Sequence, residues 1–337
     1  MLKKVVAFIF ISLLLCACTR DSREEVTFSS WGSITETKII NTLISEYEKE
    51  HPKVKINFLH IPQNYFQKLH LLFASSTAPD VIFINNLYLP VYANHLEDLS
   101  AYINTEEYYP QSTDAMTYEN KLLAIPRDIS NFVVYYNKNI TGDINQNWTF
   151  DDFISLIERT TDKNHWGVSY ERDIYMASPY TLTLGFDKGM EFYKSIEGKY
   201  APAPADIGSL TLAQMFTEGK LALYISGRWM YPKLKETAEF PFGVVNFPGT
   251  VSADSSGWAI SKQSKRKAEA IKFAEFLASK QSIDYFTSTG LIVPARKDSA
   301  KLIEEKAFLN AIEKSTAVKY DRNFNKIRDS LNKKYFE

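Results

Sequence analysis

Cysteine is almost absent from this chain. Its 337 residues contain only Cys16 and Cys18, which both stand at the end of a short apolar run near the N-terminus. The rest of the chain has no thiol, so it holds no disulfide and no cysteine ligand for a metal. The five histidines form no i, i+4 pair, so the common zinc motifs are absent as well, and we expect neither a metal nor a cofactor.

Sequence signatures of catalysis are also missing. We find no G-x-S-x-G nucleophile elbow and no glycine-rich loop that would cradle a phosphate. The adjacent acidic pairs Glu106-Glu107 and Asp151-Asp152 are typical of helix starts or solvated faces. Without a nucleophile–base pair, an enzyme is the least favoured class of function, and we expect the chain not to be one.

No large excess of either charge is present. The chain has 39 basic and 40 acidic residues, a net charge of −1, which argues against a nucleic-acid partner. Apolar residues make up 45% of the sequence, enough for a large core, and the length suggests about two domains. After Glu25 no stretch is long and apolar enough to cross a membrane.

The N-terminus has the composition of a leader. Lys3 and Lys4 precede the apolar run Val5–Leu15, which is too short to span a bilayer and predicts a signal peptide over residues 1–17. The segment LCAC resembles the lipobox of bacterial lipoproteins, which implies that Cys18 is acylated and begins a tether over 18–25. A plain signal peptide with incidental cysteines and an uncleaved anchor remain alternatives.

From Val26 onward the pattern alternates between strands and helices. Strands are predicted at Val26–Ser30, in VKINFLHIP and at Val81–Ile84, with amphipathic helices between them. This order implies parallel strands, and ligands bind beyond the carboxyl ends of such strands. Those ends read SWG, PQN and NN, so one indole and several neutral amides would suit an uncharged, hydroxyl-rich ligand.

The second half continues the alternation. It has predicted strands in FVVYYN, at Leu221–Ser226 and in EFPFGVVNFPG, and a predicted helix over 264–286 that ends by Gly290. Thr149 and Asp152 have the spacing of a capping box.

These segments together resemble the family 1 extracellular solute-binding proteins, the lipid-anchored sugar receptors of ABC importers. The matching pieces follow in order FSSWG, YFQKLHLLFASSTAPDVIFIN, LEDLSAYI, NKLLAIPRDISNFVVYYNKNI, TFDDF, GKLALYISGRWMYPKL, SSGWAISKQSKRKAEAIKFAEFLAS and STGLIVPARKD. Each piece is weak alone, but eight in order over nearly the whole mature chain are specific.

The resemblance implies an α/β, two-lobed type II periplasmic-binding-protein fold in which each lobe is a mostly parallel sheet flanked by helices. The N-terminal lobe would comprise 26–128 and 258–295 and the C-terminal lobe 129–257 and 296–337, with crossings near Ile129, Trp258 and Val293. The lobes would close on a ligand between them. The implied partners are a small carbohydrate and ABC permease subunits. The implied molecule is a monomer outside the cytoplasm, held at the membrane only by its lipid.

Candidate ligand contacts come from the resemblance, position by position. They are Trp31, Asn64, Tyr65, Asn85, Asp128, Trp229, Trp258 and Arg296. Alternative roles stay open for four of them. In these alternatives, Trp31 packs against the following helix, Tyr65 belongs to the core, Asp128 pairs with Arg127 or another cation, and Arg296 forms a hinge salt bridge. Trp148 and Trp166 are assigned to structure.

Two departures from the family bear on the ligand. The chain is shorter than is usual for the family, with a reduced region around 174–210, which favours a small ligand over a long oligosaccharide. The second departure is the loop ADSSGW, which stands where the family commonly has glycines. Three functions remain open. They are a receptor for a small carbohydrate, a receptor for glycerol phosphate or another anion held by Arg127, Arg228 and Arg296, and a lipoprotein that reports to a sensor.

Overall fold

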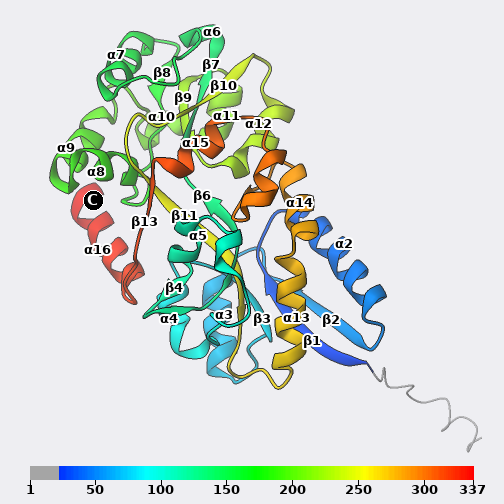
Figure 1. Cartoon of the computed structure of the whole chain (residues 1–337). Coiled ribbons are helices and arrows are strands. Elements are labelled where there is room, and N and C mark those ends of the chain that lie inside the picture. Colours follow the sequence, from blue (N-terminus) through cyan, green and yellow to red (C-terminus); the bar gives the residue numbers. More distant parts are fainter. Residues whose placement is uncertain (1–22) are drawn as a thin grey trace, which may run out of the picture.

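The computed structural model describes residues 23–337 (Figure 1). The predicted leader over 1–17 and the predicted lipid-bearing Cys18 lie outside the described residues. Within 23–337, no helix combines the length and the apolar character needed to cross a membrane.

The N-terminal part of the chain forms the predicted alternation of strands and helices. Strand β1 (Glu24–Ser30) lies between β2 (Val54–His60) and β3 (Val81–Asn85), and both run parallel to it. The connecting helices are α2 (Ile34–Glu50) and α3 (Tyr65–Ala74). Helix α2 buries the residues predicted from their spacing, which are Ile39, Ile40, Leu43, Ile44 and Tyr47.

Later parts of the chain extend this first sheet. Its order is β12-β6-β11-β3-β1-β2, with β13 paired to β11. Its later strands are β6 (Ile125–Ser130), β11 (Val251–Ile260), β12 (Val293–Pro294) and β13 (Ser315–Ala317). Strand β11 runs antiparallel to β3 and β6, β12 runs antiparallel to β6, and β13 runs parallel to β11.

Helices cover both faces of the first sheet. One face carries Phe28, Phe83 and Trp258 and packs against α2, α13 (Lys267–Leu277) and α14 (Lys280–Ser288). The other face carries Ile82 and Ile84 and packs against α3. The single helix predicted over 264–286 is therefore two helices. The chain breaks at Ser279, an N-cap whose side chain accepts a hydrogen bond from the Ser282 backbone.

The second sheet has the order β10-β7-β9-β8. Its strands are β7 (Val133–Asn137), β8 (Trp166–Val168), β9 (Leu221–Ser226) and β10 (Phe242–Asn246). The pairs β10–β7 and β7–β9 are antiparallel, and only β8–β9 is parallel. The expectation of mostly parallel sheets is therefore wrong in this lobe. A strand–helix pattern does not show whether a connection starts the next strand at the same end of the sheet or at the opposite end, so strand direction stays open. Mixed sheets are common in such folds.

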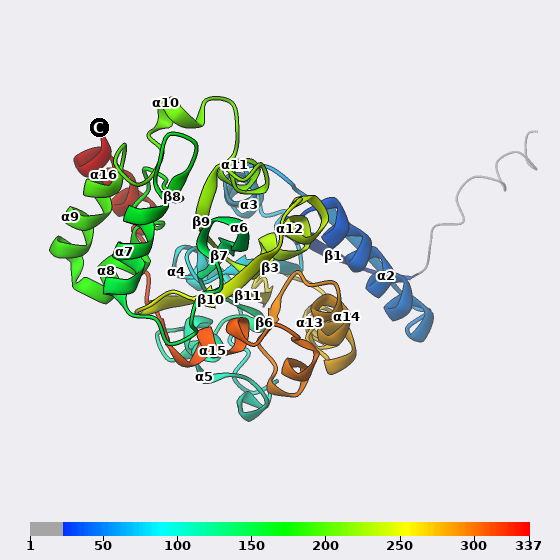
Figure 2. The same ribbon diagram turned by 90° about the horizontal axis from the view of Figure 1, so that it is seen from above.

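Helices also cover both faces of the second sheet. Phe132, Val134 and Tyr136 share a core with α7 (Phe150–Thr160), α8 (Ser178–Leu184) and α9 (Phe186–Ile196). Val133 and Tyr135 share a core with α11 (Leu212–Thr217), α12 (Tyr231–Thr237) and α15 (Ala307–Glu313). In Figure 2 the helices α7 to α9 and the pair α11 and α12 lie on opposite sides of this sheet.

Shorter elements complete the chain, together with the C-terminal helix α16. They are α4 (Leu89–Tyr92), η1 (Ala93–His95), η2 (Thr105–Glu107), α5 (Pro110–Ala115), β4 (Thr117–Tyr118), β5 (Lys121–Leu122), α6 (Lys138–Thr141), α10 (Pro204–Ile207), η3 (Arg228–Met230), η4 (Lys297–Leu302) and α16 (Phe324–Phe336). The predicted capping box of Thr149 and Asp152 is present at the start of α7.

Up to α15, the chain passes between the two sheets at three places. Two residues separate β6 from β7, and four separate β10 from β11. The third passage follows β12, from which the chain enters η4 and then α15 on the second sheet. Two of these places lie beside the predicted crossings at Ile129 and Val293. The crossing predicted near Trp258 lies earlier, because β11 already begins at Val251.

Candidate functional site

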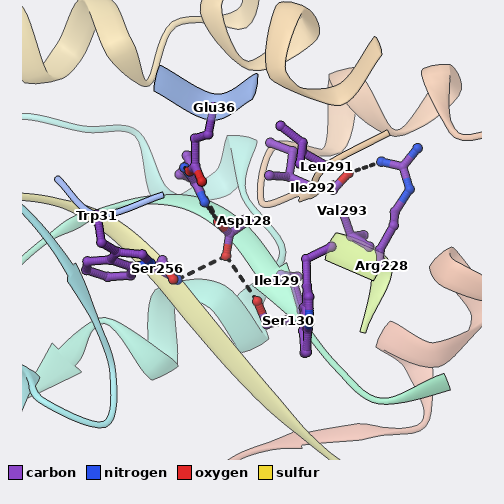
Figure 3. A pocket seen from close by; sticks show the side chains of 12 residues that line it. Trp31, Glu36, Asp128, Ile129, Ser130, Arg228, Ser256, Leu291, Ile292 and Val293 are labelled. Carbon is purple, nitrogen blue, oxygen red and sulfur yellow. Dashed lines mark hydrogen bonds and ion pairs between the residues drawn. The ribbon is translucent and has the colours of Figure 1, made fainter. Parts of the chain in front are cut away.

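A cavity of about 170 Å³ lies where the crossing strands meet both lobes (Figure 3). The first lobe contributes Trp31, the start of α2, strand β6 and the middle of β11, and the second lobe contributes Arg228 and Trp229. The segment 291–293 forms a further wall. A ligand in this cavity would therefore touch both lobes at once.

The floor of the cavity is polar and comes from the two crossing strands. Ser256 of β11 pairs with Asp128 of β6, and Ser130 lies two residues further along β6, on the same face as Asp128. The Asp128 carboxylate accepts a hydrogen bond from the Ser256 backbone N–H at 3.1 Å and one from the Ser130 hydroxyl at 3.4 Å. Figure 3 shows Asp128 at the centre of this group.

A buried ion triad holds the floor in place. The Arg127 Nε donates to Asp128 Oδ2 at 2.7 Å, and its Nη1 donates to the Glu36 carboxylate. The guanidinium also lies 4.1 Å from the centre of the Phe83 ring. Burial alone would lower the pKa of Arg127, but Asp128 and Glu36 raise it above its ordinary value. Burial raises the pKa of Asp128, and Arg127 offsets part of that increase.

Trp31 forms the wall on the side of the first lobe. It follows β1 directly, its ring packs 4.3 Å from the Phe83 ring, and part of it reaches the cavity. The next residue must be glycine. Gly32 has a φ of +139°, and a Cβ there would lie 2.5 Å from the Glu36 carboxylate. This turn places both Trp31 and the start of α2 at the cavity.

Trp229 forms the wall on the side of the second lobe. It lies in η3, and 43% of its surface is exposed. A Cβ on Gly227 would lie only 1.8 Å from the Trp229 ring, so the absence of a side chain at Gly227 lets the indole fold over the backbone. The two tryptophans thus offer aromatic surface from opposite lobes.

Arg228 is a buried cation without a carboxylate partner within the described residues. Only 7% of its surface is exposed, its Nη1 donates to the Ile292 carbonyl, and its Nε has no hydrogen-bond partner in residues 23–337. Burial lowers its pKa to about 10, so it stays charged at neutral pH. With Arg127, Glu36 and Asp128, the ionised groups around the cavity comprise two cations and two anions. Their charges sum to zero.

Three of the eight predicted contacts meet at this cavity: Trp31, Asp128 and Trp229. Asp128 also pairs with Arg127, as the alternative interpretation proposed. Asn85 pairs with Ser256 in the sheet, next to the floor, but its side chain accepts a hydrogen bond from the Tyr88 backbone.

Like Asn85, the other four predicted contacts do not line the cavity. Asn64 is an exposed residue with a φ of 56° before α3. Tyr65 is a core residue whose hydroxyl hydrogen-bonds to Ser29. Arg296 pairs with Glu107 and Asp298.

The fourth is Trp258, which the structure corrects. Its side chain has no exposed surface and packs between Phe28 and Phe83 in the core. Gly257 precedes it inside a strand, not in a crossing loop. A Cβ on Gly257 would lie 2.2 Å from the Ile125 carbonyl oxygen. The glycine therefore serves strand packing at a β-bulge and not an approach to ligand.

Three floor and wall residues escaped the sequence analysis: Glu36, Ser130 and Ser256. Ser130 had a detectable signal, because it follows Asp128 at the strand period of two. Glu36 had none, since its partner Arg127 is 91 residues away. The described residues also contain no group of three or more acidic, histidine or cysteine side chains placed to hold a metal ion.

Curated relatives align with most of the chain. A galactooligosaccharide-binding protein of Bacillus subtilis (strain 168) is 24% identical over 338 residues, which cover 86% of this chain and 79% of the relative. The maltodextrin-binding protein MdxE of the same organism is 25% identical, and the match covers 89% of this chain and 81% of the relative.

Solved structures share the fold. The ABC substrate-binding protein Lmo0181 from Listeria monocytogenes, in complex with cycloalternan, superposes with a TM-score of 0.82 at 22% identity, covering 93% of this chain and 92% of that one. The GacH receptor of Streptomyces glaucescens superposes with a TM-score of 0.80 at 20% identity, with the same coverage. The two-lobed fold expected from the sequence is thereby confirmed. The profile described as bacterial extracellular solute-binding protein matches residues 42–314, and the chain belongs to that family.

Proposed function

We propose that this protein is the carbohydrate receptor of an ABC importer, which binds a sugar between its lobes and delivers it to the permease. One observation carries the proposal: a polar floor with balanced charge lies between a tryptophan from each lobe. The function is binding rather than catalysis. Both carboxylates at the cavity, Glu36 and Asp128, are committed to Arg127.

The chemistry of this cavity suits a neutral polyol. A sugar ring has apolar C–H faces and a rim of hydroxyl groups. The indole faces of Trp31 and Trp229 would cover the C–H faces and remove them from water. Asp128, Ser130 and Ser256 would exchange hydrogen bonds with the hydroxyls. Because the ionised side chains around the cavity balance, their net charge favours neither a cationic nor an anionic ligand.

The relatives support this choice of ligand. Two of them are a galactooligosaccharide-binding protein and a maltodextrin-binding protein, and the Listeria monocytogenes protein was solved in complex with cycloalternan. All three ligands are carbohydrates.

Location and partners belong to the same proposal. We propose a molecule outside the cytoplasm, monomeric, and tethered by lipid on Cys18. It would work beside the permease subunits and need no cofactor. Two or more acyl chains hold a protein stably at a membrane.

An anionic solute such as glycerol phosphate is the second candidate, and Arg228 is the observation that favours it. A buried guanidinium with an unpaired Nε would bind a phosphate well. The other two arginines of that hypothesis do not support it. Arg127 is neutralised by Glu36 and Asp128, and Arg296 lies outside the cavity.

The test is a thermal-shift screen of the domain without its leader against neutral sugars and sugar phosphates, followed by calorimetric titration. A ligand that binds only the folded state raises the melting temperature. We expect neutral sugars to give the largest shifts, with affinities that barely change between 50 and 500 mM salt. Salt-sensitive binding of phosphates alone would favour the anion candidate. A flat screen against both classes would contradict both candidates.

A further inference from the structure

The polar floor of the cavity does not end where the cavity ends. Along β6 and β11, the pair Asp128–Ser256 is followed by the pair Ser130–Asp254, with side chains on the same face of the sheet. The first three of these residues line the cavity. Asp254 does not line it, and only 3% of its surface is exposed. Other side chains must therefore cover the polar floor at Asp254.

The cover consists of side chains from three separate parts of the chain. Asp254 accepts hydrogen bonds from the Tyr320 hydroxyl at 2.8 Å, the Tyr175 hydroxyl at 2.8 Å and the Asn86 amide at 2.9 Å. The Ser252 hydroxyl adds a fourth at 3.1 Å. Asn86 follows β3 in the first lobe, Tyr175 precedes α8 in the second, and Tyr320 follows β13. With four donors already bound, this carboxylate is satisfied by the protein itself.

The aromatic wall of the second lobe leads to the same place. From Trp229 at the cavity, ring contacts continue to Phe132 at 6.3 Å and from there to Tyr175 at 5.5 Å. The wall that would stack on a sugar therefore extends beyond the open cavity as far as the hydroxyl that holds Asp254. The covered portion has an aromatic side and a polar floor like the open portion, but there the Tyr320 hydroxyl bonds the floor residue Asp254.

Contacts on both lobes fix the position of Tyr320. Strand β13 runs parallel to β11, with Ala317 beside Ala253, so the following residues advance along β11 toward Asp254. On the first lobe, Arg322 pairs with Glu119 at 3.1 Å, and Lys319 donates to the Asp114 carbonyl.

Helix α16 anchors the other end of this segment. Arg328 pairs with Asp173 at 2.5 Å, and Asn332 accepts a hydrogen bond from the Ile174 backbone at 2.8 Å. Figure 1 shows α16 returning along α8 and α9 of the second lobe, while its first turn lies near β4 of the first. The segment is thus held on both sides of Tyr320.

We propose that Tyr320 is a specificity-determining residue that closes one end of the cleft and limits the ligand to about one sugar ring. The inference rests on the proposed carbohydrate function and adds a limit on ligand length. The open cavity of about 170 Å³ is smaller than the usual 300–1,000 Å³ of small-molecule sites. At about 30 Å³ per water in the liquid, this volume holds about six waters, which matches the size of one sugar ring better than that of an oligosaccharide.

The experiment measures affinity against ligand length. The full domain is titrated calorimetrically with glucose, maltose and maltotriose, and with galactose and its β-1,4 dimer and trimer. We expect the wild type to bind one of the single-ring sugars at least tenfold more tightly than its trimer. In Tyr320→Ala, the trimer should gain at least tenfold relative to the monomer, because the end of the cleft is open. A gain in affinity cannot come from misfolding.

Three further variants make the result specific. Tyr320→Phe keeps the ring and should keep the wild-type length preference. Tyr335→Ala removes a tyrosine from α16 that packs on the second-lobe core, and it should also keep that preference. If Tyr320→Ala does not fold, Tyr320→Ala with Asp254→Asn avoids leaving a buried carboxylate short of a donor.

The outcomes separate this inference from the function on which it rests. A wild type that binds a trimer as tightly as its monomer overturns the length limit but leaves the carbohydrate receptor standing. An unchanged length preference in the folded Tyr320→Ala variant also overturns the limit. A wild type that binds no sugar in the panel or in the wider screen contradicts the receptor proposal itself. If no variant folds, the wild-type series alone decides.

Discussion

Replacing Trp229 by alanine should weaken sugar binding strongly while leaving the fold intact. Trp229 keeps 43% of its surface exposed, so little core packing depends on it. A tryptophan offers up to about 250 Å², so the exposed part is about 110 Å². If a sugar covers half of that, the burial contributes about 1.4 kcal/mol at about 25 cal/mol per Å².

The geometry of the ring contact adds to this term. Contact with an aromatic face contributes about 0.5–1.5 kcal/mol beyond plain burial, by analogy with aromatic pairs. The sum is about 2–3 kcal/mol, which corresponds to an increase in Kd of about 30- to 150-fold. Calorimetric titration of Trp229→Ala with the best ligand of the screen measures it directly.

Two other tryptophans serve as controls for this variant. Trp148 is buried and donates its Nε1 hydrogen to the Asn246 carbonyl at 2.8 Å, so Trp148→Ala should lower Tm and spare the affinity of the folded fraction. Trp258→Ala should cost about 3–5 kcal/mol of folding free energy, since its ring is fully buried. If folded Trp229→Ala binds within twofold of the wild type, the stacking model is refuted and the anion candidate moves ahead.

Four other predictions concern the anchor, the motion, the support of Trp229 and Asp254. Cells fed a fatty-acid probe should label the wild type and not Cys18→Ala, and an unlabelled wild type refutes the lipobox interpretation. Small-angle scattering should show a smaller radius of gyration with saturating ligand, because ligand shifts lobes toward closure, and an unchanged radius with a confirmed binder removes the hinge. Gly227→Ala should weaken binding about as much as Trp229→Ala with little change in Tm, because the new Cβ would displace the indole while a φ of −92° suits alanine. Burial raises the pKa of Asp254 above the ordinary value of about 3.9, so the folding stability of the wild type should fall as pH rises from about 4 toward the raised pKa. Over that pH window the Tm of the wild type should fall relative to the Tm of Asp254→Asn. A Tm difference that stays constant with pH contradicts this.

The sequence predicted the strands and helices well because each has a local signal. The spacing of Ile39, Ile40 and Leu43 along α2, and the buried run of β3, follow from periodicity within one element. Strand direction in the second sheet carried no such signal. It depends on whether a connection starts the next strand at the same end of the sheet or at the opposite end. Strands such as β7 and β9, which are buried on both faces, read as continuous apolar runs in either direction.

The candidate site was predictable only in part, for a related reason. Trp31 directly follows β1, Trp229 comes three residues after β9, and Asp128 lies two residues before the end of β6, so all three are near strand ends at the cavity. Trp258 misled the prediction because Gly257 before it looked like loop flexibility, whereas that glycine admits the Ile125 carbonyl inside a sheet.

Contacts between distant segments left no pattern to detect. Tyr320 and Asp254 are 66 residues apart, and Asn86 is 168 residues from Asp254. No local periodicity marks a hydrogen bond between side chains so far apart in sequence, so the closed end of the cleft became visible only in three dimensions.

The position of the floor links ligand binding to lobe motion. Asp128 and Ser256 belong to β6 and β11, the strands that carry the chain between the two sheets, while Trp31 and Trp229 belong to opposite lobes. A ligand that touches both tryptophans has its full affinity only when the lobes bring them together, so its differential affinity for the closed form supplies the free energy of closure. A contact of about 2–3 kcal/mol with Trp229 would alone shift an open–closed ratio by about 30- to 150-fold. The same side chain is therefore expected to govern both affinity and closure, and Trp229→Ala should reduce the ligand-induced contraction in scattering along with binding.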